Sequence, residues 1–229
     1  MSNGKQHGDA GTRGRGDKRV VDAAALSLSP RPDSYVSPLR VFCAVELPSE
    51  VRARAVEHIT RLREAMPYAR VSWERMEKLH ITLKFLGEIA PNQIEALSDA
   101  ASRAVQRTRP FIVALEGAGA FPPRGVPRIL WLGINDSSGA LSELQSHLEE
   151  DCERVGFARE ERPFHPHLTI ARIRTPRAAR QLAHLHQELG FEAIEFYITE
   201  LVVIQSELAS GGSRYTEISR HSFKAVVSE

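Results

Sequence analysis

The chain has 229 residues, 42% of them hydrophobic, which is enough for one large domain or two fused small lobes. Its 30 Lys and Arg against 29 Asp and Glu give a formal net charge of +1, which excludes a global positive field drawing it onto long nucleic acid. Cys43 and Cys152 form no CxxC pair, which argues against a disulfide framework and a zinc site and fits a reducing cytosol. No run approaches the roughly 18 apolar residues that span a bilayer. We therefore expect a soluble, unsecreted protein.

Residues 1–37 are rich in Gly, Ser, Arg, Lys and Asp and show no sustained hydrophobic period. Such a segment buries too little apolar surface to offset its ordering entropy, so we expect a disordered tail. Its basic stretch at 13–19 fits a solvated extension better than a loose RNA contact. The folded part is expected to cover residues 38–229.

Hydrophobic patterns then predict alternating strands and helices. The apolar run 41–45 predicts a buried strand, and apolar residues at helical spacing follow from 49 to 66. Short strands are expected at 71–73 and 79–85, after which Pro91 opens a second helix.

The second half of the chain continues the alternation. Strands are expected at 111–115 and 128–134, separated by a Gly/Pro-rich loop, and a third helix ends near Gly156. The remaining expected elements are a strand at 167–172, a helix opening at Pro176, and strands near 194–205 and 215–223. Together these elements predict an α+β fold.

One tetrapeptide pattern occurs twice. The sequence His-Ile-Thr-Leu at 80–83 is echoed by His-Leu-Thr-Ile at 167–170, a spacing of 167 − 80 = 87 residues. This spacing is too long for a solenoid repeat, but it suits two similar lobes related by a pseudo-two-fold axis.

The pattern separates polar from apolar side chains. Residues two apart on a strand face the same way, so His80 and Thr82 share one face while Ile81 and Leu83 share the other. The second copy at 167–170 behaves identically. If the lobes pack about the expected axis, two imidazoles and two hydroxyls meet in one cleft.

Such a cleft suits a cyclic phosphodiester. Ring opening needs a base to deprotonate water, an acid to protonate the departing ribose oxygen, and donors for the non-bridging oxygens. Imidazole is suited to both proton transfers because its unperturbed pKa of about 6.5 lies near neutral pH. This chemistry requires no metal and no other cofactor.

The alternative reading is structural, because a single HxT on a strand is common by chance and a lone histidine is usually a surface or core residue. The repetition in the same phase on two predicted strands favours function. The pair His165 and His167 could also be read as metal ligands. However, Pro166 lies between them, and the first motif has no matching second histidine.

These motifs resemble the two-histidine phosphoesterase superfamily, and most closely its RNA 2′,3′-cyclic phosphodiesterase branch, historically called the bacterial 2′-5′ RNA ligases. The resemblance covers roughly residues 39–222. The segments that carry it are RVFCAV with LP at 40–48, LHITLKFLG at 79–87, PRILWLG at 127–133, FHPHLTIAR at 164–172 and IQSEL at 204–208.

The resemblance implies a bilobal fold, with antiparallel sheets lining a central cleft and helices outside, and hydrolysis of the cyclic phosphate to a 2′-phosphate. It implies that His80 protonates the leaving 3′ oxygen and that His167 activates water. Thr82 and Thr169 would hold phosphate oxygens. It further implies that Arg172 binds phosphate and that Phe42 stacks on the terminal base. The structural alternatives are an ion pair for Arg172 and a plain core phenylalanine for Phe42.

Several functions remain open. The same site could join RNA halves as a 2′-5′ ligase, or act on a small cyclic nucleotide or ADP-ribose cyclic phosphate. A different class is an RNA-binding module whose histidines only contact phosphate. The expected partner is RNA ending in a cyclic phosphate, with tRNA fragments as one option. We expect a cytoplasmic monomer that does not associate with membranes.

Overall fold

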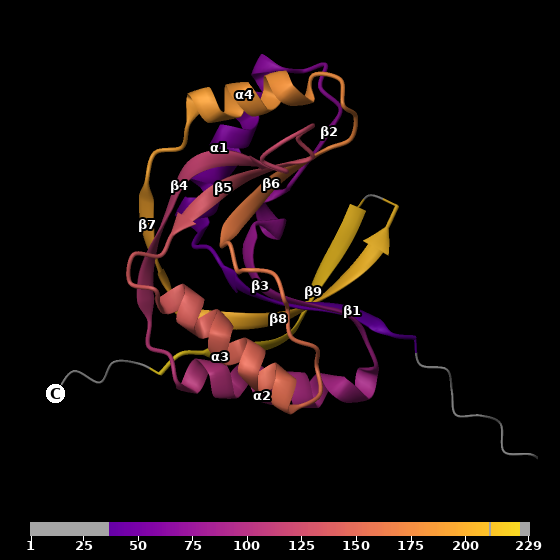
Figure 1. The fold of residues 1–229 in the computed structure, drawn as a ribbon, viewed down its shortest axis with the longest axis vertical. Coiled ribbons are helices and arrows are strands. Elements are labelled where there is room, and N and C mark those ends of the chain that lie inside the picture. Colours follow the sequence, from indigo (N-terminus) through magenta and orange to yellow (C-terminus); the bar gives the residue numbers. More distant parts are fainter. Residues whose placement is uncertain (1–36, 211, 225–229) are drawn as a thin grey trace, which may run out of the picture. The chain divides into compact units, whose positions relative to one another are not determined.

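The computed structural model describes residues 37–210 and 212–224. The predicted tail at 1–37 therefore lies, except for Ser37, outside the described residues. One sheet with a continuous apolar core on its helix-covered side organises the described part (Figure 1). The strands are β1 (Leu39–Glu46), β2 (Val71–Trp73), β3 (His80–Ile89), β4 (Phe111–Phe121), β5 (Ile129–Asn135), β6 (His167–Ile173), β7 (Ile194–Ile198), β8 (Glu200–Ala209) and β9 (Gly212–Ser222). The helices are α1 (Ser49–Ala65), α2 (Ile94–Gln106), α3 (Ala140–Arg154) and α4 (Ala179–Leu189), with short 3₁₀ turns η1 (Met76–Lys78) and η2 (Pro91–Gln93).

The strand order is β7-β4-β5-β6-β3-β1-β8-β9, with β2 pairing to β6, and every pairing is antiparallel. At the centre of this order, β3 and β6 share a single residue pair, Ile81 with Leu168. The sheet therefore consists of two halves joined at one point. This arrangement confirms the expected α+β class and the two lobes.

The helices exchange partners between the halves. Helices α2 and α3 lie side by side under the half that contains β3, where α3 contacts β3 and α2 contacts β8 and β9 (Figure 1). Helices α1 and α4 contact each other, and α4 covers β4 of the other half. Helix α1 follows β1 in the chain but contacts α4 of the other half, and α3 follows β5 but contacts β3. Each half of the sheet is thus covered in part by a helix that follows a strand of the other half.

The alternation predicted for both motifs is present. Ile81, Leu83, Leu168 and Ile170 are buried in the core, at 4% exposure or less. The residues between them, including both motif histidines, are half-buried on the opposite face.

Several predicted boundaries were wrong. The strands expected at 79–85 and 111–115 run on to Ile89 and to Phe121. The strand expected at 194–205 is two strands, because strand pairing is interrupted at Thr199. The Thr199 carbonyl oxygen accepts a hydrogen bond from the Phe223 N–H (2.9 Å). The helix expected from Pro176 begins at Ala179, because Ala178 takes a left-handed conformation with φ of 64°.

A buried histidine pair joins α1 to α4. His58 Nε2 lies 2.9 Å from His186 Nδ1, and His186 Nε2 lies 3.0 Å from the Trp131 carbonyl oxygen. Because a carbonyl only accepts, His186 donates from Nε2, and His58 donates to the His186 Nδ1 lone pair. Burial lowers the pKa of both imidazoles, with His58 at about 4.

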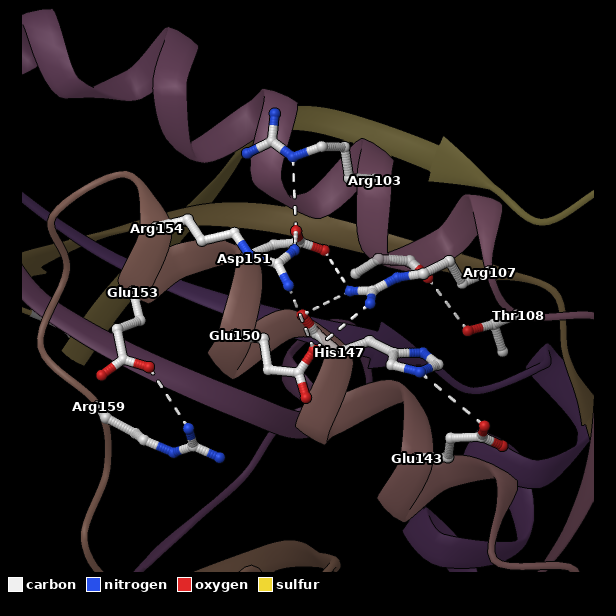
Figure 2. Close-up of polar contacts among 11 residues, drawn as sticks. Arg103, Arg107, Thr108, Glu143, His147, Glu150, Asp151, Glu153, Arg154 and Arg159 are labelled. Carbon is white, nitrogen blue, oxygen red and sulfur yellow. Dashed lines mark hydrogen bonds and ion pairs between the residues drawn. The ribbon is translucent and has the colours of Figure 1, made fainter.

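A buried carboxylate joins α2 to α3. Asp151 of α3 is 1% exposed and accepts from Arg154 (2.7 Å) and from Arg107, while Arg103 Nε lies 3.5 Å away (Figure 2). Arg103 belongs to α2, and Arg107 directly follows that helix, so this carboxylate connects the two helices that support β3.

We expect Asp151→Asn to lower the free energy of unfolding by about 1–3 kcal/mol, because the amide loses the charge that its arginine partners face. Urea titration at pH 7 measures the change. The control is Glu150→Gln, a more exposed neighbour on α3 that also pairs with arginines, which should cost less than about 0.5 kcal/mol. Equal losses in both variants would contradict the role given to Asp151.

Stability should fall as the pH drops from about 6.5 towards 4. In this window the unfolded chain takes up protons on His58 and His186, whereas burial keeps these imidazoles neutral in the folded state. Urea midpoints at pH 7, 6, 5 and 4.5 measure the slope. His58→Gln, which keeps a donor but does not titrate, should flatten it; an unchanged slope would exclude His58 as a contributor.

Candidate active site

The single pair between β3 and β6 places the two motifs side by side in the sheet. Ile81 and Leu168 oppose each other and point into the core. Continuing the antiparallel register puts His80 across from Thr169 and Thr82 across from His167, all on the other face. His80 and His167 each lie one residue from this pair, on opposite sides of it along the strands.

Both imidazoles are oriented by the same contact. His80 Nδ1 lies 2.7 Å from the carbonyl oxygen of Lys78, and His167 Nδ1 lies 2.8 Å from that of His165. A carbonyl only accepts, so each Nδ1 carries the proton and donates it. Each neutral imidazole therefore has its lone pair on Nε2, the nitrogen that can exchange a proton with a substrate.

Aromatic rings surround His80. Phe42 stacks on it with 4.8 Å between ring centroids, and Tyr215 meets it edge-on at 5.4 Å. Burial lowers the pKa of His80 to about 4, while the hydrogen bond to Lys78 and the charge of Glu46 act against this shift. In the ligand-free protein His80 is therefore neutral at pH 7.

His167 also sits against two aromatic rings. Phe121 meets it edge-on at 5.2 Å, and Trp131 lies at 6.4 Å. The Trp131 ring covers Gly119 so closely that a Cβ at residue 119 would lie 2.1 Å from a ring carbon. Glycine at this position is thus required for the aromatic wall behind His167.

A bulge follows each motif and changes the phase of the strand. In β6, Trp131 pairs with Thr169 but Leu130 pairs with Ala171, so Ile170 is the extra residue. Ile170 and Ala171 are both buried, and Arg172 is exposed. The bulge thus turns Arg172 to the face of Thr169, although it is the third residue after Thr169.

The first motif has the same bulge. In β3, Ala44 pairs with Thr82 but Cys43 pairs with Lys84, so Leu83 is the extra residue. Phe85 then turns to the face of Thr82 and is 64% exposed. The offset from the histidine is five residues in both copies, 85 − 80 and 172 − 167, so Phe85 and Arg172 occupy equivalent positions.

The predicted contact residues differ in how accessible they are. Arg172 is half-exposed, and its Nε lies 3.6 Å from Glu74 Oε1, a surface-type pair that leaves the guanidinium able to meet an anion. Phe42 is only 3% exposed and is covered by His80, Phe85 and Tyr215, which leaves little of its ring for a base. Sequence reasoning missed Phe85, although the repeated offset of five was visible in the sequence.

Among residues 37–210 and 212–224, no group of three or more His, Cys, Asp or Glu is placed to hold a metal ion. In the same residues, no helix is long and apolar enough to cross a membrane. His165 contributes its backbone carbonyl to His167, while its side chain is exposed.

Comparison with known proteins places the chain in a family. Residues 47–209 match the model of the 2′-5′ RNA ligase superfamily. The chain is 32% identical to a protein of Methanothermobacter thermautotrophicus named RNA 2′,3′-cyclic phosphodiesterase, over 79% of this chain and 96% of the relative. It is also 32% identical to an Escherichia coli K12 protein of the same name, over 80% of this chain and 96% of the relative.

Solved structures share the fold. The Thermus thermophilus protein TT0787 superposes with a TM-score of 0.66 at 26% identity, covering 81% of this chain and 98% of that one. E. coli LigT complexed with 3′-AMP gives 0.63 at 29% identity, covering 82% and 99%. The chain belongs to the 2′-5′ RNA ligase superfamily, together with the proteins named RNA 2′,3′-cyclic phosphodiesterase.

Proposed function

We propose that this protein hydrolyses the 2′,3′-cyclic phosphate at an RNA end to a 2′-phosphate, with His80 and His167 as its acid–base pair. The observation that carries the proposal is the paired orientation of the two imidazoles. Each comes from one of two adjacent strands, and each donates Nδ1–H to the carbonyl two residues earlier, so both Nε2 atoms remain for substrate. The names of the relatives support the same reaction.

In the proposed reaction, His167 Nε2 takes a proton from water, and the water oxygen forms a bond to phosphorus. The bond from phosphorus to the 3′ oxygen breaks, and His80 Nε2–H protonates that oxygen. The products are a 2′-phosphate and a 3′-hydroxyl. Water attacks in line with the leaving oxygen, so the two histidines must stand on opposite sides of the phosphate.

The acid role of His80 depends on the substrate. In the ligand-free protein its low pKa leaves Nε2 unprotonated at pH 7. A bound phosphate anion favours the imidazolium and raises this pKa, so His80 would take up a proton as substrate binds. This coupling loads the proton donor only when there is a leaving group to protonate.

The other polar groups have complementary tasks. Thr82 and Thr169 would donate hydrogen bonds to the non-bridging oxygens, and the Arg172 guanidinium would balance charge in the transition state. Phe42, which is buried against His80, would hold that imidazole in place. The exposed ring of Phe85 is better placed to meet a nucleobase.

Ligation uses the same groups. If an RNA 5′-hydroxyl replaces water as the nucleophile, the product is a 2′-5′ linkage, which is the reaction in the superfamily's description. We also propose that the protein works as a monomer, since one chain supplies both histidines, and in the cytoplasm, since both cysteines are buried free thiols.

The first test is turnover of a short RNA ending in 2′,3′-cyclic phosphate, in the presence of EDTA, with the product resolved by chromatography. We expect the 2′-phosphate. Linked RNA fragments would instead indicate ligation, a preference for mononucleotides would indicate a small substrate, and binding without turnover would leave only an RNA-binding module. Loss of turnover in EDTA would contradict a metal-independent reaction.

His80→Ala and His167→Ala should each lower kcat by at least about 100-fold, because each removes one of the two proton transfers. Circular dichroism checks that the variants remain folded. The matched control is His165→Ala, which keeps the backbone carbonyl that orients His167 and should retain near-normal kcat. An equal loss of kcat in His165→Ala and His167→Ala would contradict the base role given to His167.

A titration of the His80 Cε1–H signal by NMR tests the loading of the acid. Without ligand the pKa should lie near 4, and saturating inorganic phosphate should raise it. His80→Ala identifies the signal by its loss. A pKa that phosphate leaves unchanged would remove His80 from the acid role.

A further inference from the structure

The two histidines need a fixed separation, yet their strands share only one residue pair. The chain reaches His167 from α3 through residues 157–166, which form neither helix nor strand. This segment leaves α3 beside β3 and crosses to β6 in the other half (Figure 1). Its last part includes His165, whose carbonyl orients the imidazole of His167.

A buried ion pair ties the start of this segment to β3. Lys84, two residues after Thr82, is 4% exposed, and its Nζ lies 2.6 Å from Glu149 Oε2 of α3. The same Nζ donates to the Ala158 carbonyl at 2.8 Å, and Glu149 Oε2 accepts from the Glu160 N–H at 3.2 Å. One lysine of the first motif strand thus holds the segment that leads to the second motif.

Side-chain packing anchors the two ends of the segment, since Phe157 is buried in the core and Phe164 packs against it, but not the part between them. A cavity of about 450 Å³ lies between the end of β3 and residues 158–162 and is lined by Lys84, Phe85 and Leu86 on the strand side. The segment is therefore not packed tightly onto β3 beyond Lys84. Its attachment there is polar, through the two backbone groups of Ala158 and Glu160.

The equivalent position in the second copy shows that the fold itself does not require a charge there. The shared bulge makes Ala171 the counterpart of Lys84, and Ala171 is fully buried with an apolar side chain. A buried ion pair is also a poor source of stability, because desolvation of both charges offsets their attraction. Lys84 and Glu149 therefore call for an explanation other than stability.

We infer that the Lys84–Glu149 ion pair positions His167 relative to His80 by fixing residues 158–160 to β3. This inference rests on the proposed function, since it assigns positioning residues for that reaction. Neither side chain touches the substrate; both act through the segment that ends in the His165 carbonyl.

The double variant Lys84→Met/Glu149→Leu tests the inference without leaving a buried charge unpaired. Its thermal midpoint should stay within a few degrees of wild type, since apolar replacements of buried pairs are often neutral. Its kcat should fall about 10- to 100-fold with a smaller change in KM, as expected when reacting groups are misplaced by about 1 Å. A kcat within about twofold of wild type at a matched thermal midpoint would overturn the inference.

Two controls separate positioning from stability. Asp151→Asn, on the same helix but bonded to α2, should lower stability and leave kcat unchanged. Glu160→Pro removes the N–H that Glu149 accepts and should lower kcat, whereas Glu160→Ala keeps that N–H and should not. Equal activities of the two Glu160 variants would overturn the inference even if the double variant fails to fold.

A readout without turnover distinguishes this inference from the proposed function. Inorganic phosphate, followed through the Cε1–H signals of His80 and His167, should bind more weakly to the double variant and to Glu160→Pro than to wild type. If the wild-type protein opens no cyclic phosphate but these differences appear, the proposed reaction is wrong and the positioning role stands. Unchanged phosphate affinity in both variants would overturn the positioning role.

Discussion

The site depends on the contact of two strands at a single residue pair. Ile81 and Leu168 meet at the centre of the sheet, and no further ladder joins β3 to β6, both of which the structure describes in full. A longer ladder would close the cleft with backbone hydrogen bonds and bring the polar side chains into contact with each other. A sheet that separates completely would leave each histidine facing solvent alone. One pair keeps the two motifs adjacent on one face of the sheet.

Because only one residue pair joins the two halves of the sheet, other interactions must hold the halves together. The exchange of α1 and α3 between the halves is one of them, since each half then completes its core with a helix from the other. The buried His58–His186 contact and the Asp151 cluster secure the helices on either side. Neither half has a complete core without the other, so the two halves must fold together.

Much of this arrangement was accessible from sequence. The alternation in the two motifs predicted which residues are buried and which share a face, since period-two patterning is local to the strand. The repeat of the motif indicated two related halves. The break at Thr199 was missed because the residues around it are continuously strand-like, and only a contact from Phe223 reveals it.

Other features depend on contacts that the alternation along a strand does not show. The bulges after Thr82 and Thr169 invert the expected facing of the residues beyond them, so Phe85 was missed. Arg172 was predicted from the family pattern and not from strand phase. Phe42 was predicted to meet a base, but its burial comes from Tyr215 of β9, a strand at the far end of the chain. The partner of Lys84 lies 65 residues away on α3, and no local pattern marks it.

The shared bulge has a consequence for how a ligand approaches. The same backbone irregularity displays a benzyl ring after the first histidine and a guanidinium after the second. Equivalent positions in the two halves thus carry different side chains, Phe85 suited to flat heterocycles and Arg172 suited to anions. A pseudo-symmetric cleft alone would accept a nucleotide in either of two orientations related by the axis. Because Phe85 and Arg172 differ, the two orientations are not equivalent. The orientation in which a nucleotide binds would then depend on this one difference between the two halves.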